Sequence, residues 1–366
     1  MVRFGPTFVA GLAGLASIAA AHPGHDVKAE AAERAAFLKR APLHSRGLSH
    51  CTEKLHARGH EASNVARREL TVEKLRHRRG LRPRALYPRA RDFDATIPIP
   101  TSHHSSLDVD QTVDPAVLFG SNATCILGPD TTEGPYYVSG ELIRKDVSEE
   151  QAGVPLYLDF QIIDTSTCDP LPNIYLDIWH CNATGVYSGV LARGNGDSND
   201  VSLLDATFLR GIQKTDKTGV VQFESIFPGH YTGRTHHIHV LSHPGNSTTV
   251  NPNGTISGLF NPHASYVGQT FFDQDLIYKV EALDTYAANK QPLTTNDEDG
   301  ILAGEAKVID PFMQYVYLGD RIEDGLFAWI SLGIDASRES NVRAGAYYTE
   351  NGGVEDNLPG GGPPPA

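Results

Sequence analysis

The chain has 366 residues, of which 40% are hydrophobic and 20% are charged, a composition that fits a folded protein and excludes disorder along most of its length. Its net charge of −13 is uneven, because residues 1–91 carry 18 Lys and Arg against 7 Asp and Glu, whereas residues 92–366 carry 13 against 37. An acidic body repels phosphate backbones, so we expect no nucleic-acid partner.

The first 21 residues have the pattern of a secretory signal peptide. Arg3 gives a positive start, residues 8–18 form a short apolar run, and residues 19–21 are the small residues typical of a cleavage site. The alternative interpretation of this run is a buried apolar helix. No later stretch approaches the ~20 apolar residues that span a bilayer, so we expect a secreted, extracellular protein without a membrane anchor.

A secreted protein can form disulfides between its cysteines and can carry glycans on its asparagines. The four cysteines are Cys51, Cys125, Cys168 and Cys181. An even number in an oxidising compartment permits two disulfides, and the sequence does not choose among the three possible pairings. No Cys-x-x-Cys occurs, so a thiolate metal site is not expected. Asn-x-Ser/Thr sequons predict a glycoprotein, and they begin at Asn122, Asn182, Asn246 and Asn253.

Residues 22–93 form a basic, partly helical segment. Thr52 could cap a helix that continues to Leu75, and a run of arginines follows. Three interpretations stay open: a solvated helix face, a pro-segment removed at the dibasic Lys39-Arg40, or a basic piece that packs against the acidic body. The Pro- and Ser-rich residues 94–118 predict a linker.

Residues 119–335 predict an all-β domain. Apolar and polar residues alternate over residues 154–164, 174–180, 220–227 and 237–241, as in half-buried strands. Helical stretches are sparse, and residues 275–288 are the best candidate. Short strands separated by turns favour a β-sandwich over an α/β sheet. Residues 336–366 are expected to form a C-terminal tail, and its Gly/Pro-rich residues 351–366 are expected to be disordered.

A group of polar residues around His237 is the densest candidate site. His237 and His239 would point to the same face of a strand, because side chains alternate with a period of two. Two imidazoles on one strand face are a common metal-ligand pair. Tyr231 follows a Pro-Gly turn six residues before His237, and Arg234 stands between them.

Three segments, in this order, make the chain resemble the intradiol ring-cleavage dioxygenases, such as catechol 1,2-dioxygenase and protocatechuate 3,4-dioxygenase. They are E-G-P-x-Y at residues 133–137, W-H-x-x-x-x-G-x-Y-S at residues 179–188, and P-x-x-Y followed by R-x-x-H-I-H at residues 228–239. The resemblance covers about residues 119–335. The arrangement of signal, basic stretch and linker is similar to the secreted fungal branch of that family.

The resemblance implies one non-haem Fe(III) per chain. Its ligands would be the phenolates of Tyr187 and Tyr231 and the imidazoles of His237 and His239, with a hydroxide as fifth ligand. Iron(III) is a hard cation that favours oxygen donors, and a bound cation overcomes the ordinary phenol pKa of about 10. Tyr231 would also accept a substrate proton, and Arg234 would stabilise charge on the ring. The substrate-binding residues implied are Pro135, Tyr136 and Gln269.

The implied reaction inserts O₂, the co-substrate, into a catechol-type ring and gives a cis,cis-muconate-type product. The segment 232–236 between Tyr231 and His237 is short, which predicts an open pocket and bulky catechols as substrates. Which catechol is used, and the oligomeric state, remain open.

Two rival interpretations belong to other functional classes. The first is a non-catalytic secreted β-sandwich that uses the same scaffold for binding. The second is a hydrolase, either a zinc enzyme built on the histidines or a serine enzyme. The sequence contains no H-E-x-x-H and no G-x-S-x-G, which weighs against both kinds of hydrolase.

Overall fold

The structure is a computed structural model. It describes residues 48–81, 124–126, 134–191, 194–196, 199–244, 250–256, 263–306, 309–338, 340–349 and 351–356. The expected signal peptide at residues 1–21, the linker at residues 94–118 and the sequons at Asn122 and Asn246 lie outside these residues.

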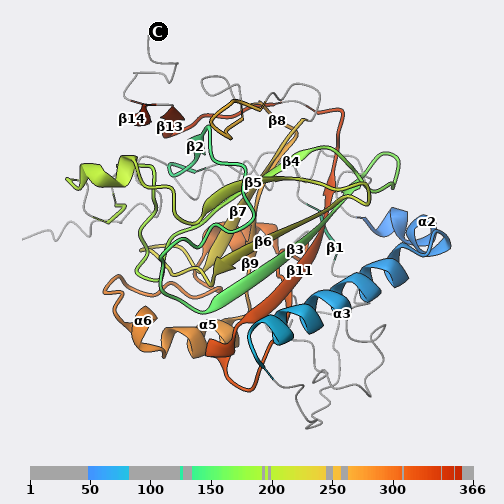
Figure 1. Cartoon of the computed structure of the whole chain (residues 1–366), viewed down its shortest axis with the longest axis horizontal. Helices are drawn as coiled ribbons and strands as arrows, with labels where there is room; N and C mark the ends of the chain where they lie inside the picture. The colour runs from blue at the N-terminus through green and yellow to red at the C-terminus, as the bar shows by residue number, and fades with distance from the viewer. Residues whose placement is uncertain are drawn as a thin grey trace, which may run out of the picture.

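Two sheets form the body of the protein (Figure 1). A five-stranded sheet has the order β1-β11-β3-β6, and β10 pairs with β11; its strands are β1 (Thr124–Ile126), β3 (Pro155–Asp164), β6 (Val220–Ile226), β10 (Gln314–Tyr317) and β11 (Leu326–Ile334). A four-stranded sheet has the order β5-β4-β7-β9; its strands are β4 (Tyr175–Trp179), β5 (Arg210–Lys214), β7 (His237–His243) and β9 (Tyr266–Phe271).

Alternate residues of both sheets share one hydrophobic core. Leu158 and Phe160 of β3 belong to the same buried cluster as Ile178 of β4 and Ile238 and Val240 of β7. Because successive side chains point to opposite faces, each sheet turns one face to this core and the other away from it. The predicted all-β sandwich is therefore confirmed, and each of the four predicted strands overlaps an observed one.

The basic N-terminal segment covers the outer face of the five-stranded sheet. It comprises η2 (Ser49–Cys51), α2 (Thr52–Ala57) and α3 (His60–Arg78), and Figure 1 shows α3 running alongside β3 and β11. The cluster between α3 and the sheet consists of Val65, Val72, Leu75, Tyr157, Val316, Leu318, Phe327 and Trp329. One continuous helix capped by Thr52 was the wrong prediction, because Gly59 adopts a φ of 65° that separates two helices whose first cap is Cys51.

Charge pairs and a disulfide attach this segment to the acidic body. Arg67 and Arg68 of α3 both contact Asp159, whose side chain is fully buried. Cys51 is disulfide-bonded to Cys168, which closes a span of 117 residues. The arrangement agrees with a basic piece that packs against the acidic body. A cross-link over a loop of this length restricts the unfolded chain by about 4 to 5 kcal/mol in the chain-entropy description.

Among the described residues, Cys181 does not take part in a second disulfide. Cys181 is a free thiol and is 1% exposed. It packs in a cluster with Tyr136, Trp179 and Tyr187 and fills space as a small apolar side chain.

The chain beyond β11 continues into two further small sheets. One joins β2 (Val138–Ser139), β13 (Ala346–Thr349) and β14 (Gly352–Glu355), and the other joins β8 (His263–Ala264) and β12 (Ser340–Asn341). A disordered tail was therefore the wrong prediction for residues 351–355. Its glycines serve close packing, since a Cβ on Gly353 would overlap the carbonyl of Leu204. Residues 357–366 lie outside the described part.

Short helices follow β9 and cover one end of the sandwich. They are α5 (Gln274–Glu281), α6 (Asp284–Ala287) and α7 (Gly300–Glu305), while η3 (Val201–Leu204) and η4 (Ile322–Asp324) lie elsewhere in the chain. The helix predicted over residues 275–288 is thus divided in two. Among the described residues, we find no helix with the length and apolar content that a bilayer crossing requires.

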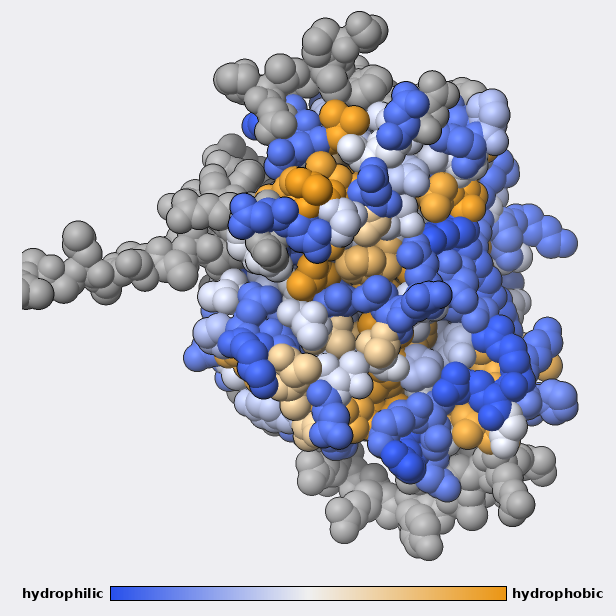
Figure 2. Space-filling model, turned by 60° about the vertical axis from the view of Figure 1, so that its left-hand side comes forward, coloured by the Kyte–Doolittle hydropathy of each residue, from blue (hydrophilic) through white to orange (hydrophobic). Residues whose placement is uncertain are grey.

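The surface carries its apolar residues in small patches. On the face seen in Figure 2, hydrophilic residues separate several apolar groups. The large apolar side chains that are exposed among the described residues are Leu70, Val201, Val250, Tyr278 and Val354, and they come from separate parts of the chain. Scattered exposed residues of this kind are normal on a folded protein and do not mark an interface.

We predict that Asp159→Asn destabilises the fold by about 3 kcal/mol or more, because it leaves the guanidinium of Arg68 buried without its counter-charge. The control is Asp169→Asn, which removes an exposed partner of Arg58 and should cost under about 1 kcal/mol. Urea unfolding of both variants measures the difference. Equal losses of stability would show that the buried pair does not hold α3 to the sheet.

Candidate functional site

Four residues lie side by side across the four-stranded sheet. Arg210 of β5 pairs with Trp179 of β4, Trp179 pairs with His239 of β7, and His239 pairs with Gln269 of β9. Paired residues of neighbouring strands point to the same face, and this face is the one turned away from the core. The Trp179 indole stacks on the His239 imidazole, with centroids 4.7 Å apart and planes 7° apart, and so fixes the imidazole.

The two histidines of β7 point at one another from the same strand face. Nε2 of His237 lies 3.1 Å from Nε2 of His239. Nδ1 of His237 donates to the carbonyl oxygen of Thr235 at 2.6 Å, so the proton sits on Nδ1 and Nε2 presents a lone pair. A backbone acceptor that fixes the tautomer in this way is a common feature of metal-ligating histidines.

Two tyrosines complete the cluster. The hydroxyl oxygen of Tyr187 lies 3.5 Å from Nε2 of His237. The Tyr231 ring centroid is 5.6 Å from that of His237 and 5.7 Å from that of Tyr187. All four side chains are at most 2% exposed. The structure thus brings together the two phenols and two imidazoles that the sequence singled out as metal ligands.

Glycines let the two tyrosine loops approach closely. The backbone N–H of Arg234 donates to the carbonyl of Tyr231 at 3.0 Å, and Gly233 takes a φ of 87° in this turn. Gly185 has a φ of 82°, and a Cβ there would overlap the carbonyl oxygen of His230. The loop before Tyr187 therefore packs backbone against backbone with the loop that carries Tyr231.

Tyr136 forms one wall of the cluster. Its ring stacks on Tyr187, with centroids 4.5 Å apart, and meets Tyr231 edge-on at 5.4 Å. Pro135, its neighbour, is partly exposed, and its carbonyl lies against Gly345. Of these two predicted substrate-binding residues, Tyr136 is thus in contact with the proposed ligands.

Arg234 is held from two sides. Its Nε donates to Asp299 Oδ2 at 2.8 Å, its terminal NH₂ donates to Gln269, and both Arg234 and Asp299 are fully buried. Asp299 Oδ2 also accepts the N–H of Thr235, and its Oδ1 caps the N-terminus of α7. Gln269, the third predicted substrate-binding residue, lies directly beside the cluster. Asp299 was not foreseen.

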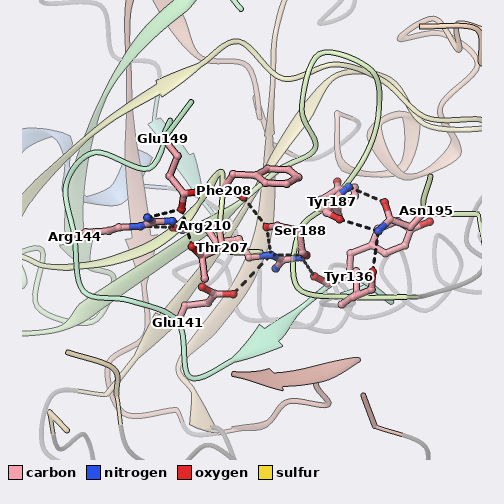
Figure 3. Close-up of polar contacts among 11 residues, drawn as sticks. Tyr136, Glu141, Arg144, Glu149, Tyr187, Ser188, Asn195, Thr207, Phe208 and Arg210 are labelled. Atoms are coloured by element: carbon pink, nitrogen blue, oxygen red, sulfur yellow. Dashed lines mark hydrogen bonds and ion pairs between the residues drawn. The ribbon is translucent and has the colours of Figure 1, made fainter. Parts of the chain in front are cut away.

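Arg210 was also missed by sequence reasoning. Figure 3 shows its guanidinium between the Tyr136 and Tyr187 segments and Glu141. It donates to the carbonyls of Tyr136 at 2.7 Å and Ser188 at 2.6 Å, and lies 5.9 Å from the centroid of the Tyr187 ring. Arg210 therefore ties together two of the three sequence motifs.

Asn195 anchors the Tyr187 segment from the other side. Its side chain accepts the N–H of Tyr187 at 2.6 Å and donates to the carbonyl of the same residue at 2.8 Å (Figure 3). With both backbone groups of Tyr187 bonded, the phenol is presented by a fixed stretch of chain.

Burial makes the charged forms of these groups costly when no cation is bound. It raises the pKa of Tyr187, and it raises the pKa of Tyr231 although the positive charge of Arg234 opposes the change. Burial and Arg234 both lower the pKa of His237 below its usual range. Two phenolate oxygens are donors that a hard, highly charged cation prefers, and neutral imidazole nitrogens also suit iron. The residues therefore fit a metal such as iron(III).

The distances agree with such a site. The two Nε2 atoms lie 3.1 Å apart, so one cation could contact both of them. Tyr187, Tyr231, His237 and His239 are the residues that would hold the cation.

Comparison with known proteins shows what the chain is similar to. The profile of a protein family described as dioxygenase matches residues 127–291. A catechol 1,2-dioxygenase of Acinetobacter baylyi is 32% identical over 130 residues, which are 34% of this chain and 38% of that protein. A catechol 1,2-dioxygenase of a Pseudomonas strain is 38% identical over 65 residues, 16% of this chain and 21% of that protein. The chain thus spans well under half the length of these relatives.

The solved structures to which the chain is similar include an intradiol ring-cleavage dioxygenase from Tetranychus urticae. It is 28% identical to this chain, with a TM-score of 0.47, and the match covers 60% of this chain and 98% of that one. The catechol 1,2-dioxygenase of an Acinetobacter species is 21% identical, with a TM-score of 0.34 and coverage of 58% and 63%.

We predict that Asp299 and Arg234 are energetically coupled. Asp299→Ala should cost about 3 kcal/mol or more in the native chain, because it leaves the Arg234 guanidinium buried without its counter-charge. In an Arg234→Met background the same change should cost at least about 2 kcal/mol less. Urea unfolding of the four proteins gives the coupling energy. The control is Asp297→Ala at an exposed position, whose cost should be the same in both backgrounds. A cost of Asp299→Ala that is also the same in both backgrounds would contradict the prediction.

Proposed function

Because the chain belongs to the intradiol ring-cleavage dioxygenase family, we propose that it is an extracellular Fe(III) enzyme that inserts both atoms of O₂ into a catechol-type ring. The product would be a cis,cis-muconate-type dicarboxylate. The observation that carries this proposal is the convergence of Tyr187, Tyr231, His237 and His239 at one buried point beside the guanidinium of Arg234. The pattern of residues 1–21 supports secretion.

Each residue of the cluster has a task in this reaction. When bound, iron(III) supplies the positive charge that favours the doubly deprotonated catechol. Tyr231 Oη, as a phenolate, accepts a proton from one catechol hydroxyl. Tyr187, backed by Arg210 and Asn195, stays in place and keeps the site assembled. Tyr136 offers an aromatic wall against which a planar ring can pack.

Arg234 stabilises the negative charge that builds on the ring. Its guanidinium is oriented before the substrate arrives, since Asp299 and Gln269 accept hydrogen bonds from two of its nitrogens. The guanidinium is fully buried, so its charge acts in a medium of low dielectric constant. Fixed electrostatic contacts of this type account for much of the rate acceleration of many enzymes.

The substrate class follows from the donor set and the site's walls. A vicinal diol on an aromatic ring can present two oxygens to one cation, and the ring can pack against Tyr136. We propose Pro135 as a further lining residue and catechols with bulky ring substituents as substrates, on the basis of the short 232–236 segment. Non-catalytic binding on the same scaffold would not require this complete set of ligands.

We predict about one iron per purified chain, a broad visible absorption from phenolate-to-iron charge transfer, and oxygen uptake with catechols. His237→Ala and His239→Ala should lose the iron, because each removes a nitrogen donor. Tyr231→Phe should keep part of the iron and lose turnover, because its oxygen accepts the substrate proton. A colourless, zinc-loaded protein that is active, or full turnover by Tyr231→Phe, would contradict the assignment.

A panel of plain and 4-substituted catechols tests the substrate class in the same assay.

Arg234→Lys is predicted to keep the iron while kcat falls by roughly 10²-fold, the scale for the loss of one transition-state electrostatic contact. Lysine retains the positive charge but loses the planar fork that reaches both Asp299 and Gln269. Steady-state kinetics and metal analysis on the same preparation measure the two effects separately. An unchanged kcat would assign Arg234 to the structure alone.

A further inference from the structure

The short segment that carries Tyr231 and Arg234 is bonded, residue by residue, to the stretch 281–299. Thr232 N donates to Gln291 Oε1 at 3.0 Å, and Gly233 N donates to Thr294 Oγ1 at 3.0 Å. The hydroxyl of Thr235 donates to Asn296 Oδ1 at 2.7 Å. These bonds join the turn to a stretch about 60 residues further along the chain.

Glu281, at the end of α5, holds both ends of this segment. Its Oε1 accepts from Nδ1 of His230 at 2.9 Å and from Nε2 of His236 at 2.8 Å. His230 directly precedes Tyr231, and His236 directly precedes His237. A single carboxylate oxygen therefore fixes the separation between two of the four proposed ligands.

The hydrogen bonds of the two histidines identify their role. Nε2 of His230 lies 3.0 Å from the carbonyl of Gln291, so both ring nitrogens face oxygens that only accept. The three side chains lie close enough for a metal ion, but Oε1 is already occupied by two N–H donors. We therefore interpret the group as a hydrogen-bonded clamp.

The position of Glu281 in its helix supports this interpretation. A carboxylate in the last turn lies at the negative end of the helix dipole, where cations are favoured. Its side chain is 16% exposed, so it is also partly withdrawn from water. Helix stability does not explain a glutamate at this place, whereas the two imidazoles do.

We propose that Glu281 is a positioning residue that sets the spacing of Tyr231 and His237 by holding His230 and His236. The proposal rests on the proposed function for its effect on catalysis. The clamp itself does not depend on iron, because every contact that defines it lies among the side chains of this chain.

The test compares Glu281→Ala with Glu281→Gln. Glutamine keeps an oxygen that can accept both N–H donors, and alanine removes it. The matched controls are Glu298→Ala and Glu298→Gln, since Glu298 lies in the same stretch, is exposed, and bonds only to Thr295 in the described part of the chain. Amide hydrogen exchange of residues 231–236 is measured in the metal-free proteins, and kcat, KM and the visible absorption band are measured after iron loading.

We expect Glu281→Ala to speed exchange of these amides about tenfold, as loss of such hydrogen bonds implies, and Glu281→Gln to stay within about threefold of the native chain. In the iron-loaded protein, kcat of Glu281→Ala should fall roughly 10-fold to 10²-fold with little change in KM, because a misplaced ligand slows chemistry more than binding. Its absorption band should shift, and glutamine should restore both properties.

The outcomes separate the two proposals. Exchange that is the same in Glu281→Ala and in the Glu298 controls overturns the clamp, whatever the catalytic result. Faster exchange in Glu281→Ala, together with a native chain that takes up no iron and cleaves no catechol, supports the clamp and overturns the proposed function. Faster exchange together with an unaltered band and kcat shows that Glu281 holds the segment without positioning the ligands, which also overturns the positioning role.

Discussion

The burial of two phenols and two imidazoles at one point is the constraint on which the rest of the structure depends. Such groups are costly to bury without polar partners, and here Nε2 of His237 lies 3.1 Å from Nε2 of His239 and 3.5 Å from the Tyr187 hydroxyl oxygen, with the Tyr231 ring packed beside them. The sandwich makes room for them by using its two outer faces differently. Helix α3 covers the outer face of the five-stranded sheet, so the opposite outer face is left for the site.

The site is held by residues from distant parts of the chain. Trp179 stacks on His239, Arg210 binds the carbonyls of the Tyr136 and Tyr187 segments, and Asp299 fixes Arg234. Glu281 adds a tie between the ends of the segment that carries Tyr231. Each of these partners lies on a strand, at a helix end or in a helix cap. The fold therefore fixes these partners, and they in turn hold the proposed ligands in position.

The sequence was informative where the signal is local. Alternation predicted the strands, and a period of two placed His237 and His239 on one face. Long-range partners leave no such signal: Asp299 is 65 residues from Arg234, and one carboxylate among 44 acidic residues is not distinctive. The same reason hid the Cys51–Cys168 pairing. Composition misled at residues 351–355, where glycines that look like a flexible tail allow close packing of β14.

Resonance Raman spectroscopy of the iron-loaded protein tests the central claim most directly, because excitation within the visible band enhances only the groups bonded to the metal. The account predicts phenolate ring modes that shift when the tyrosines are deuterium-labelled, and that change in pattern when either Tyr187 or Tyr231 is replaced by phenylalanine. A visible iron band without tyrosine modes, or modes that neither substitution alters, would contradict the assignment of these two residues as ligands.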